Sequence, residues 1–144
     1  MKLAIGADHR GVEIKRRLTQ WLQSLGHEVT DVGAHSTESV DYPDVARTAA
    51  NMLAAGAVER IILLCGTGIG MAIAANKVRS VRAHSIRTPF EAEISRRHND
   101  LNALCLSAEL PETDLQQLIS LFLETEFEGG RHARRVEKLD SCGG

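Results

Sequence analysis

The sequence has no excess of charge of either sign and no long apolar run. Its 144 residues include 17 Lys and Arg against 19 Asp and Glu, so the formal net charge is −2. This balance argues against a broad face for nucleic acid. No apolar run approaches the length of about 20 residues that a membrane span needs, and the opening MKLAIGADHRG mixes acid with base where a signal peptide would be apolar. We therefore expect neither a nucleic-acid partner nor membrane association.

Paired cysteines and spaced metal ligands are missing as well. Cys65, Cys105 and Cys142 are odd in number and far apart, without a CxxC pair, which favours reduced thiols in the cytoplasm. The 6 histidines have no ligand spacing such as HxxxH, so no metal site is predicted. The chain also lacks internal repeats and linkers, and its length suits one core. Residues 1–144 are therefore expected to form a single domain.

Short apolar runs alternate with segments of helical periodicity. Strands are expected over residues 2–7, 27–32, 60–64, 81–86 and 103–106. Helices are expected over residues 12–25, 44–55, 71–76, 88–97 and 115–122. The alternation predicts an α/β fold, a Rossmann-like doubly wound three-layer sandwich with a five-stranded parallel sheet. The remaining tail, over residues 128–139, is polar and carries Arg131, Arg134 and Arg135.

Chemistry-bearing residues lie next to three of the expected strands. In doubly wound folds a ligand binds outside the carboxyl ends of the strands. Asp8 and His9 follow the first strand, and Cys65 with the glycine-rich segment GTGIG follows the third. The segment before the fifth strand, with His98 and Asn99, is expected at the same edge. These side chains are therefore predicted to meet in one site.

The glycine-rich segment by itself leaves several alternatives open. Backbone N–H groups of such a turn can converge on an anion, but the turn can also be only a tight connection. The spacing matches neither a dinucleotide-binding GxGxxG nor a Walker loop, and Met71 stands where a phosphatase-type Cys-x5-Arg loop needs arginine. Cys65 could be a small buried apolar side chain. Its place beside the loop amides favours a base or nucleophile instead.

His98 and the arginines of the tail are also ambiguous. A histidine between a helix and a strand can be a solvated surface residue or an acid in catalysis. Arg131 and Arg135 lie four positions apart, which places them on one face of a helix. They could be a solvated face or could hold a phosphate group.

Five segments together resemble one known family. They are GADHRG at 6–11, DYPD at 41–44, CGTGIGMAIAANK at 65–77, RRHNDLN at 96–102 and EGGRHARRVEKL at 128–139. In this order and spacing they resemble ribose-5-phosphate isomerase type B, within the ribose/galactose phosphosugar isomerase family. The resemblance implies an aldose–ketose isomerase that interconverts ribose 5-phosphate and ribulose 5-phosphate through a cis-enediolate, without metal or organic cofactor. It also implies a homodimer with active sites at the interface, and it leaves open whether dimers pair into tetramers.

The resemblance assigns roles residue by residue. Cys65 would be the base that moves a proton between C1 and C2 of the sugar, and Thr67 with His98 would assist opening of the furanose ring. Loop amides would hold the enediolate oxygen, polar side chains would contact the sugar, and two arginines would hold the phosphate. These binding residues are Gly66, Gly68, Ile69, Gly70, Asp8, His9, Asn99, Arg131 and Arg135.

One position departs from the family pattern. After the fifth strand the family has glycine followed two positions later by a phosphate-binding arginine, whereas this chain has Ser107 and Glu109. Glu109 could point away, Arg87 or Arg134 could compensate, or the substrate could be a tetrose, hexose or modified pentose phosphate. A non-catalytic sugar-phosphate-binding protein is a further alternative, against which the retained site residues argue.

Overall fold

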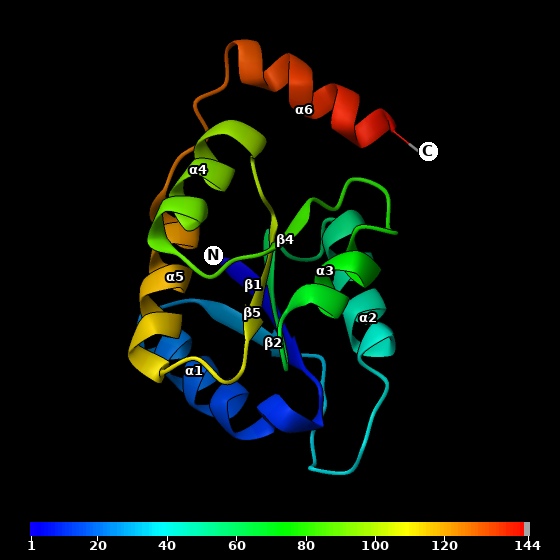
Figure 1. Ribbon diagram of the computed structural model, residues 1–144, viewed down its shortest axis with the longest axis vertical. Coiled ribbons are helices and arrows are strands. Elements are labelled where there is room, and N and C mark those ends of the chain that lie inside the picture. The colour runs from blue at the N-terminus through cyan, green and yellow to red at the C-terminus, as the bar shows by residue number, and fades with distance from the viewer. Residues whose placement is uncertain (143–144) are drawn as a thin grey trace.

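Five parallel strands form one sheet at the centre of the molecule (Figure 1). In this computed structural model, which describes residues 1–142, the strands lie in the order β2-β1-β3-β5-β4. Their bounds are Lys2–Ala7 for β1, Glu28–Asp31 for β2, Arg60–Cys65 for β3, Ala83–Ser85 for β4 and Ala103–Ser107 for β5. The central strands β1, β3 and β5 are buried over almost their whole length, as expected of parallel strands that are covered on both faces.

Helices cover both faces of this sheet. Within the described residues they are the short 3-10 helix η1 (His9–Gly11) and the α-helices α1 (Val12–Ser24), α2 (Tyr42–Ala54), α3 (Ile69–Ala75), α4 (Pro89–Asn99), α5 (Glu112–Glu124) and α6 (Arg131–Ser141). One apolar layer joins α1, α4 and α5 to one face of the sheet, with Leu22, Ile62 and Phe122 fully buried. A second layer joins α2 and α3 to the other face, around Ala49 and Leu63. The predicted doubly wound three-layer sandwich is thereby confirmed.

None of these helices, over residues 1–142, is long and apolar enough to cross a membrane.

The polar tail differs most from the sequence-based expectation. It forms helix α6, which lies at one end of the molecule, beyond the amino ends of the strands (Figure 1). Only His132 and Val136 of this helix are buried, so its apolar face is too narrow to stand out in the sequence. Arg82, just before β4, pairs with Asp140 of α6 at 2.9 Å. Cys142 follows α6 directly, and its thiol donates to the carbonyl of the residue four positions earlier at 3.2 Å.

Smaller differences occur where local packing overrides periodicity. Helix α2 begins at Tyr42 rather than at 44, because Pro43 is favoured in the first turn of a helix. Helix α3 begins at Ile69 rather than at Met71, so part of the predicted loop is helical. Strand β4 is limited to Ala83–Ser85 instead of residues 81–86, as a short strand at the edge of the sheet.

The order of the strands makes the ends of β1 and β3 a topological switch point. From β1 the chain passes to β2 on one side, and from β3 it passes to β4 at the far edge and returns to β5 between β3 and β4. At such a switch point the connections diverge and leave room for a ligand at the carboxyl edge. Ala7 pairs with Leu64, so the segments that follow these two strands emerge side by side.

Candidate active site

Asp8 and His9 leave β1 at the carboxyl edge of the sheet. The backbone N–H of Asp8 donates to the carbonyl of Leu64 at 3.1 Å, which ties this exit to β3. The Asp8 carboxylate, 7% exposed, accepts the backbone N–H of Arg10 at 3.0 Å. His9 Nδ1 accepts the backbone N–H of Val40 at 3.3 Å, so the neutral ring carries its proton on Nε2. His9 therefore offers a hydrogen-bond donor beside a nearly buried carboxylate.

Cys65 ends β3 next to this exit, with its sulfur directed at the glycine-rich loop. The residue is 5% exposed, and Sγ accepts the backbone N–H of Gly68 at 3.1 Å. A donor aimed at the sulfur stabilises negative charge there. The backbone N–H of Ile69 donates to Thr67 Oγ1 at 3.1 Å. Of the four loop residues whose amides were expected to hold an anion, Gly68 and Ile69 therefore have their N–H groups engaged within the loop.

Neighbouring segments approach the loop so closely at two positions that a side chain larger than that of glycine would not fit there. Gly68 has φ +80, and a Cβ atom there would lie 2.9 Å from Ser85 Oγ and 3.0 Å from backbone atoms of Leu106. A Cβ atom on Gly70 would overlap the ring of Tyr42, from the DYPD segment. The loop is therefore pressed against β5 on one side and against the start of α2 on the other.

The approach of Gly68 to β5 predicts a measurable loss of stability in Gly68→Ala. Gly56 has φ +78, and outside residues 55–57 no heavy atom of the described residues lies within 4 Å of its Cβ position, so it provides a control with the same backbone strain. We expect Gly56→Ala to lose about 1–2 kcal/mol from the left-handed conformation. Gly68→Ala should lose about 1–3 kcal/mol more, because the backbone of Leu106 must also move. Chemical denaturation measures both free energies of unfolding, and equal losses would contradict the close approach.

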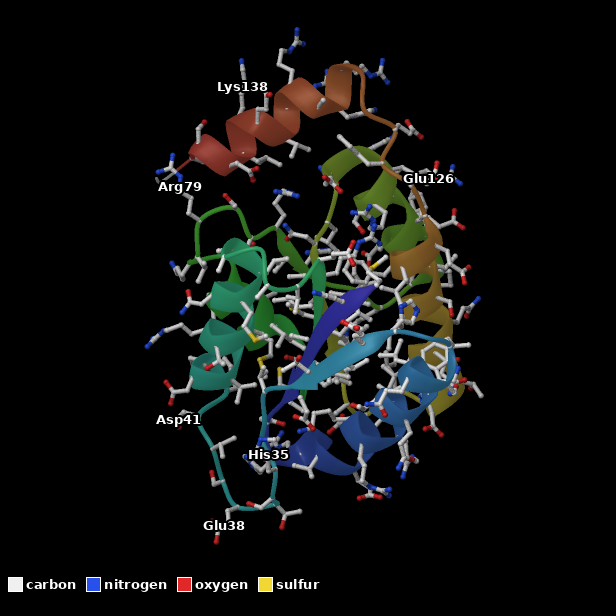
Figure 2. The ribbon with its side chains drawn as sticks, turned by 180° about the vertical axis from the view of Figure 1, so that it is seen from behind. His35, Glu38, Asp41, Arg79, Glu126 and Lys138 are labelled. Carbon is white, nitrogen blue, oxygen red and sulfur yellow. The ribbon has the colours of Figure 1, made fainter. Side chains whose placement is uncertain are left out.

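His98 and Asn99 lie at the opposite edge of the sheet, which corrects the prediction of a single edge. They end α4, just before β5 begins at Ala103 opposite Ile61, whereas Cys65 pairs with Ser107 at the other end of the same strands. A helix between two parallel strands must return the chain to the amino edge. Figure 2 shows the same division, with His35 and Asp41 at one end and Lys138 of α6 at the other.

The amino edge gathers the second group of predicted site residues. The rings of His98 and His132 are stacked, with centroids 4.2 Å apart and planes 11° apart. Oε1 of Glu128 lies 3.8 Å from Nε2 of His98 and 3.7 Å from Nε2 of His132. Burial lowers the pKa of His132, and the charges of His98 and Arg131 lower it further. Arg131 and Arg135 are both exposed on α6.

The ligand-type atoms of His98, Glu128 and His132 lie within 4.8 Å of one another. The lone pair of an imidazole nitrogen lies in the plane of its ring. Two nearly parallel rings therefore direct their lone pairs side by side, and one ring would have to turn before both could bind one ion. The spacing of the histidines in the sequence does not indicate this group. The one sequence feature that could indicate it is the separation of four residues between Glu128 and His132, which places them on one face of a helical turn.

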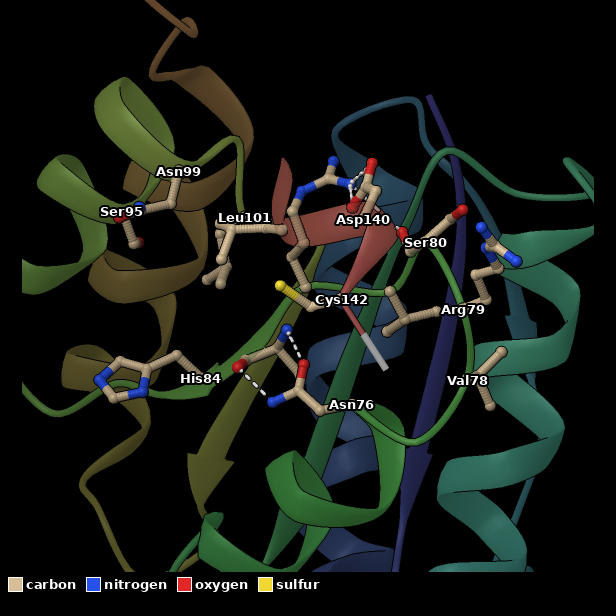
Figure 3. A pocket seen from close by; sticks show the side chains of 14 residues that line it. Asn76, Val78, Arg79, Ser80, His84, Ser95, Asn99, Leu101, Asp140 and Cys142 are labelled. Carbon is tan, nitrogen blue, oxygen red and sulfur yellow. Dashed lines mark hydrogen bonds and ion pairs between the residues drawn. The ribbon is translucent and has the colours of Figure 1, made fainter. Parts of the chain in front are cut away.

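A cavity of about 500 Å³ opens between α6, β4 and the connection from α3 to β4. Figure 3 shows Asn99 on α4 and Asp140 on α6 at its border, with Arg79 and His84 on other sides. Among the predicted site residues, Asn99 is the one that lines it. The cavity thus belongs to the amino edge and does not include the Cys65 loop.

Known isomerases match this chain over nearly its whole length. The model of the ribose/galactose isomerase family matches residues 3–139. Ribose-5-phosphate isomerase B of Escherichia coli strain K12 is 41% identical over 139 residues, covering 96% of this chain and 93% of that protein. D-erythrulose-4-phosphate isomerase of Pectobacterium atrosepticum is also 41% identical, over 141 residues, covering 96% of this chain and 95% of that protein.

A solved structure with a bound sugar phosphate has the same fold. It is ribose-5-phosphate isomerase B from Mycoplasma genitalium with bound ribulose-5-phosphate, which superposes with a TM-score of 0.92 at 34% identity and covers 96% of this chain and 93% of that one. The match of sequence and fold extends from β1 through α6, and this chain belongs to the ribose/galactose isomerase family.

Proposed function

We propose that this protein is an aldose–ketose isomerase that interconverts ribose 5-phosphate and ribulose 5-phosphate without a metal or organic cofactor. The observation that carries the proposal is the position of the Cys65 sulfur. It accepts the N–H of Gly68 at 3.1 Å, beside the segment in which Asp8 and His9 leave strand β1. A weak carbon acid needs a positioned base and donors for the oxyanion that develops. The relatives named as sugar-phosphate isomerases support this class of reaction.

The proposed reaction moves one proton between neighbouring carbons. The Cys65 thiolate takes the proton from C2 of the open-chain aldose, the C–H electrons form the C1–C2 double bond, and the C1 carbonyl oxygen becomes the enediolate oxyanion. Loop amides not already engaged, those of Gly66, Thr67 and Gly70, donate to that oxygen. The O2 hydroxyl then gives its proton to O1, O2 becomes the ketone oxygen, and the electrons of the C1–C2 double bond take the proton back from the thiol at C1.

A complete site needs groups from a second copy of the chain. Within one chain the Cys65 loop lies at the carboxyl edge, and His98 with α6 lies at the amino edge. Exposed apolar side chains on α3 support an interface near the loop, since Ile69 is 53% and Ile73 is 58% exposed. We propose a homodimer in which each site combines the loop of one chain with His98, Asn99, Arg131 and Arg135 of the other.

Two observations bear on the identity of the sugar. The relative that acts on erythrulose 4-phosphate is as similar to this chain as the ribose-5-phosphate isomerase of E. coli, at 41% identity. Glu109, at the position where the resemblance calls for a phosphate-binding arginine, is exposed. A tetrose or hexose phosphate is therefore the second candidate substrate.

The free cysteines Cys65, Cys105 and Cys142 suit a reducing compartment such as the cytoplasm.

The test is an isomerase assay over a panel of four-, five- and six-carbon sugar phosphates in deuterated water. An isomerase should exchange the substrate C2 proton with solvent as it forms the ketose, and nuclear magnetic resonance measures both events. We expect the highest kcat/KM for ribose 5-phosphate. A higher value for another sugar would change the substrate, and binding of these sugars without any exchange would identify a non-catalytic protein.

A further inference from the structure

The side chain of Arg10 lies against the first glycine of the loop. Arg10 is part of η1, where its backbone N–H is fixed by Asp8. Its Nη1 atom lies 3.0 Å from the position that a Cβ atom on Gly66 would take, and outside residues 65–67 no other heavy atom of the described residues lies within 4 Å of that position. Gly66 does not have a positive φ. The guanidinium group therefore lies directly beside the start of the loop.

Arg10 is one of several arginines of the described residues whose guanidinium has no acidic partner. Among residues 1–142, no carboxylate oxygen lies within 4.0 Å of it. Side-chain carboxylates do pair with Arg16, Arg17, Arg82, Arg96 and Arg97. Arg10 is exposed at the carboxyl edge, so its planar array of donors is open to an anion from solvent.

The base and this guanidinium occupy different flanks of the same edge. Cys65 packs in the apolar layer of α2 and α3, and its sulfur accepts from Gly68 at the start of α3. Arg10 sits on η1, where Cβ atoms of Leu64 and Ala108 would lie 3.5 Å from a Cβ atom on Gly11, on the flank of α1 and α5. An open-chain sugar phosphate bound across Gly66 would thus place its reacting carbons on the α3 flank and its far end on the Arg10 flank.

We propose that Arg10 binds the phosphate group of the substrate and sets the preference for a phosphorylated sugar. A guanidinium can donate two parallel hydrogen bonds to phosphate oxygens. The proposal rests on the proposed function, since it takes the Cys65 loop as the reacting end of the site.

Glu109 explains why a cation is needed on this flank. Its backbone N–H donates to Ser107 Oγ at 3.2 Å, and that hydroxyl donates to the carbonyl of Gly66 at 2.7 Å. These bonds hold the backbone of Glu109 near Gly66, and an acidic side chain on this segment repels an anion. Arg10 supplies the opposite charge from the neighbouring strand exit, and it thereby compensates for the acid after β5.

Arg10→Gln tests the proposal because it keeps a polar side chain and removes the charge. We expect KM for ribose 5-phosphate to rise about ten- to hundredfold, as for the loss of a hydrogen-bonded charge pair, with kcat within about threefold of its original value. Arg10→Lys should recover part of the affinity. Exchange of the C2 proton of unphosphorylated D-ribose should proceed at the same rate in Arg10→Gln and in the unaltered protein. Arg16→Gln, on α1 and paired with Glu13, is the matched control and should leave KM unchanged.

Calorimetric titration with inorganic phosphate separates this inference from the proposed function, because it needs no turnover. Arg10→Gln should weaken phosphate binding and Arg16→Gln should not. If the unaltered protein turns over no sugar phosphate while Arg10→Gln still weakens phosphate binding, the proposed function fails and the role of Arg10 stands. Unchanged phosphate affinity and unchanged KM in Arg10→Gln would overturn the proposed role of Arg10. An equal loss of activity on ribose and on ribose 5-phosphate would also overturn the proposed role of Arg10. Such a loss would indicate a role in the reaction itself.

Discussion

Cys65→Ala is expected to lower kcat for sugar-phosphate isomerisation by about a thousandfold, the contribution typical of a positioned base. Loss of the sulfur removes the group that faces Gly68 at the switch point between β1 and β3. The change is small in volume, so the fold should persist with a loss of about 1 kcal/mol. A coupled assay of ketose formation gives kcat, and circular dichroism checks the fold.

Cys105→Ala is the matched control for that experiment. Cys105 is fully buried in β5, and burial raises the pKa of its thiol, so it stays protonated and inert. Removing it should cost stability but leave kcat close to its original value. If Cys65→Ala kept normal turnover, or if both variants lost it equally, Cys65 would not be the base.

Mixing two inactive variants is expected to restore activity. Cys65→Ala damages the carboxyl edge, and the double change Arg131→Ala with Arg135→Ala damages the amino edge. Each variant alone should have little activity, because every site of its dimer contains the damage. In a mixed dimer one site collects both defects and the other collects none. Random pairing should therefore recover about a quarter of the original activity, since half of the dimers are mixed and each has one intact site.

The mixture must be prepared by co-expression, and mass spectrometry of the intact complexes should verify that mixed dimers form. A mixture of Cys65→Ala with Cys65→Ser, both of which lack the base at the carboxyl edge, serves as the control and should recover nothing. Mixed dimers without recovered activity in the first pair would mean that each site is built within one chain.

The alternation of strands and helices was predictable because each element has its own periodicity. Burial on both faces makes β1, β3 and β5 continuously apolar, and that signal is strong in any single sequence. Helix α6 was not predictable in the same way. Its buried positions are few, and its place is fixed by tertiary contacts such as Arg82 with Asp140.

The candidate site was predictable in its residue types more than in its geometry. Asp8, His9 and Cys65 were expected at the carboxyl edge from the ends of their strands, and they lie there. His98 and Asn99 were expected beside them and lie at the other edge, because α4 carries the chain back before β5 begins. Contacts that no local spacing encodes, such as Gly70 with Tyr42 and Arg10 with Gly66, became visible only in three dimensions.

The division of site residues between two edges has a thermodynamic consequence. A ligand that touches the Cys65 loop of one chain and α6 of another binds the pair and not either chain alone. Linkage then requires that the ligand strengthen association by the same factor by which association strengthens ligand binding. In such an arrangement the sugar phosphate is also a component of the assembly, and its concentration helps to decide how many chains are paired.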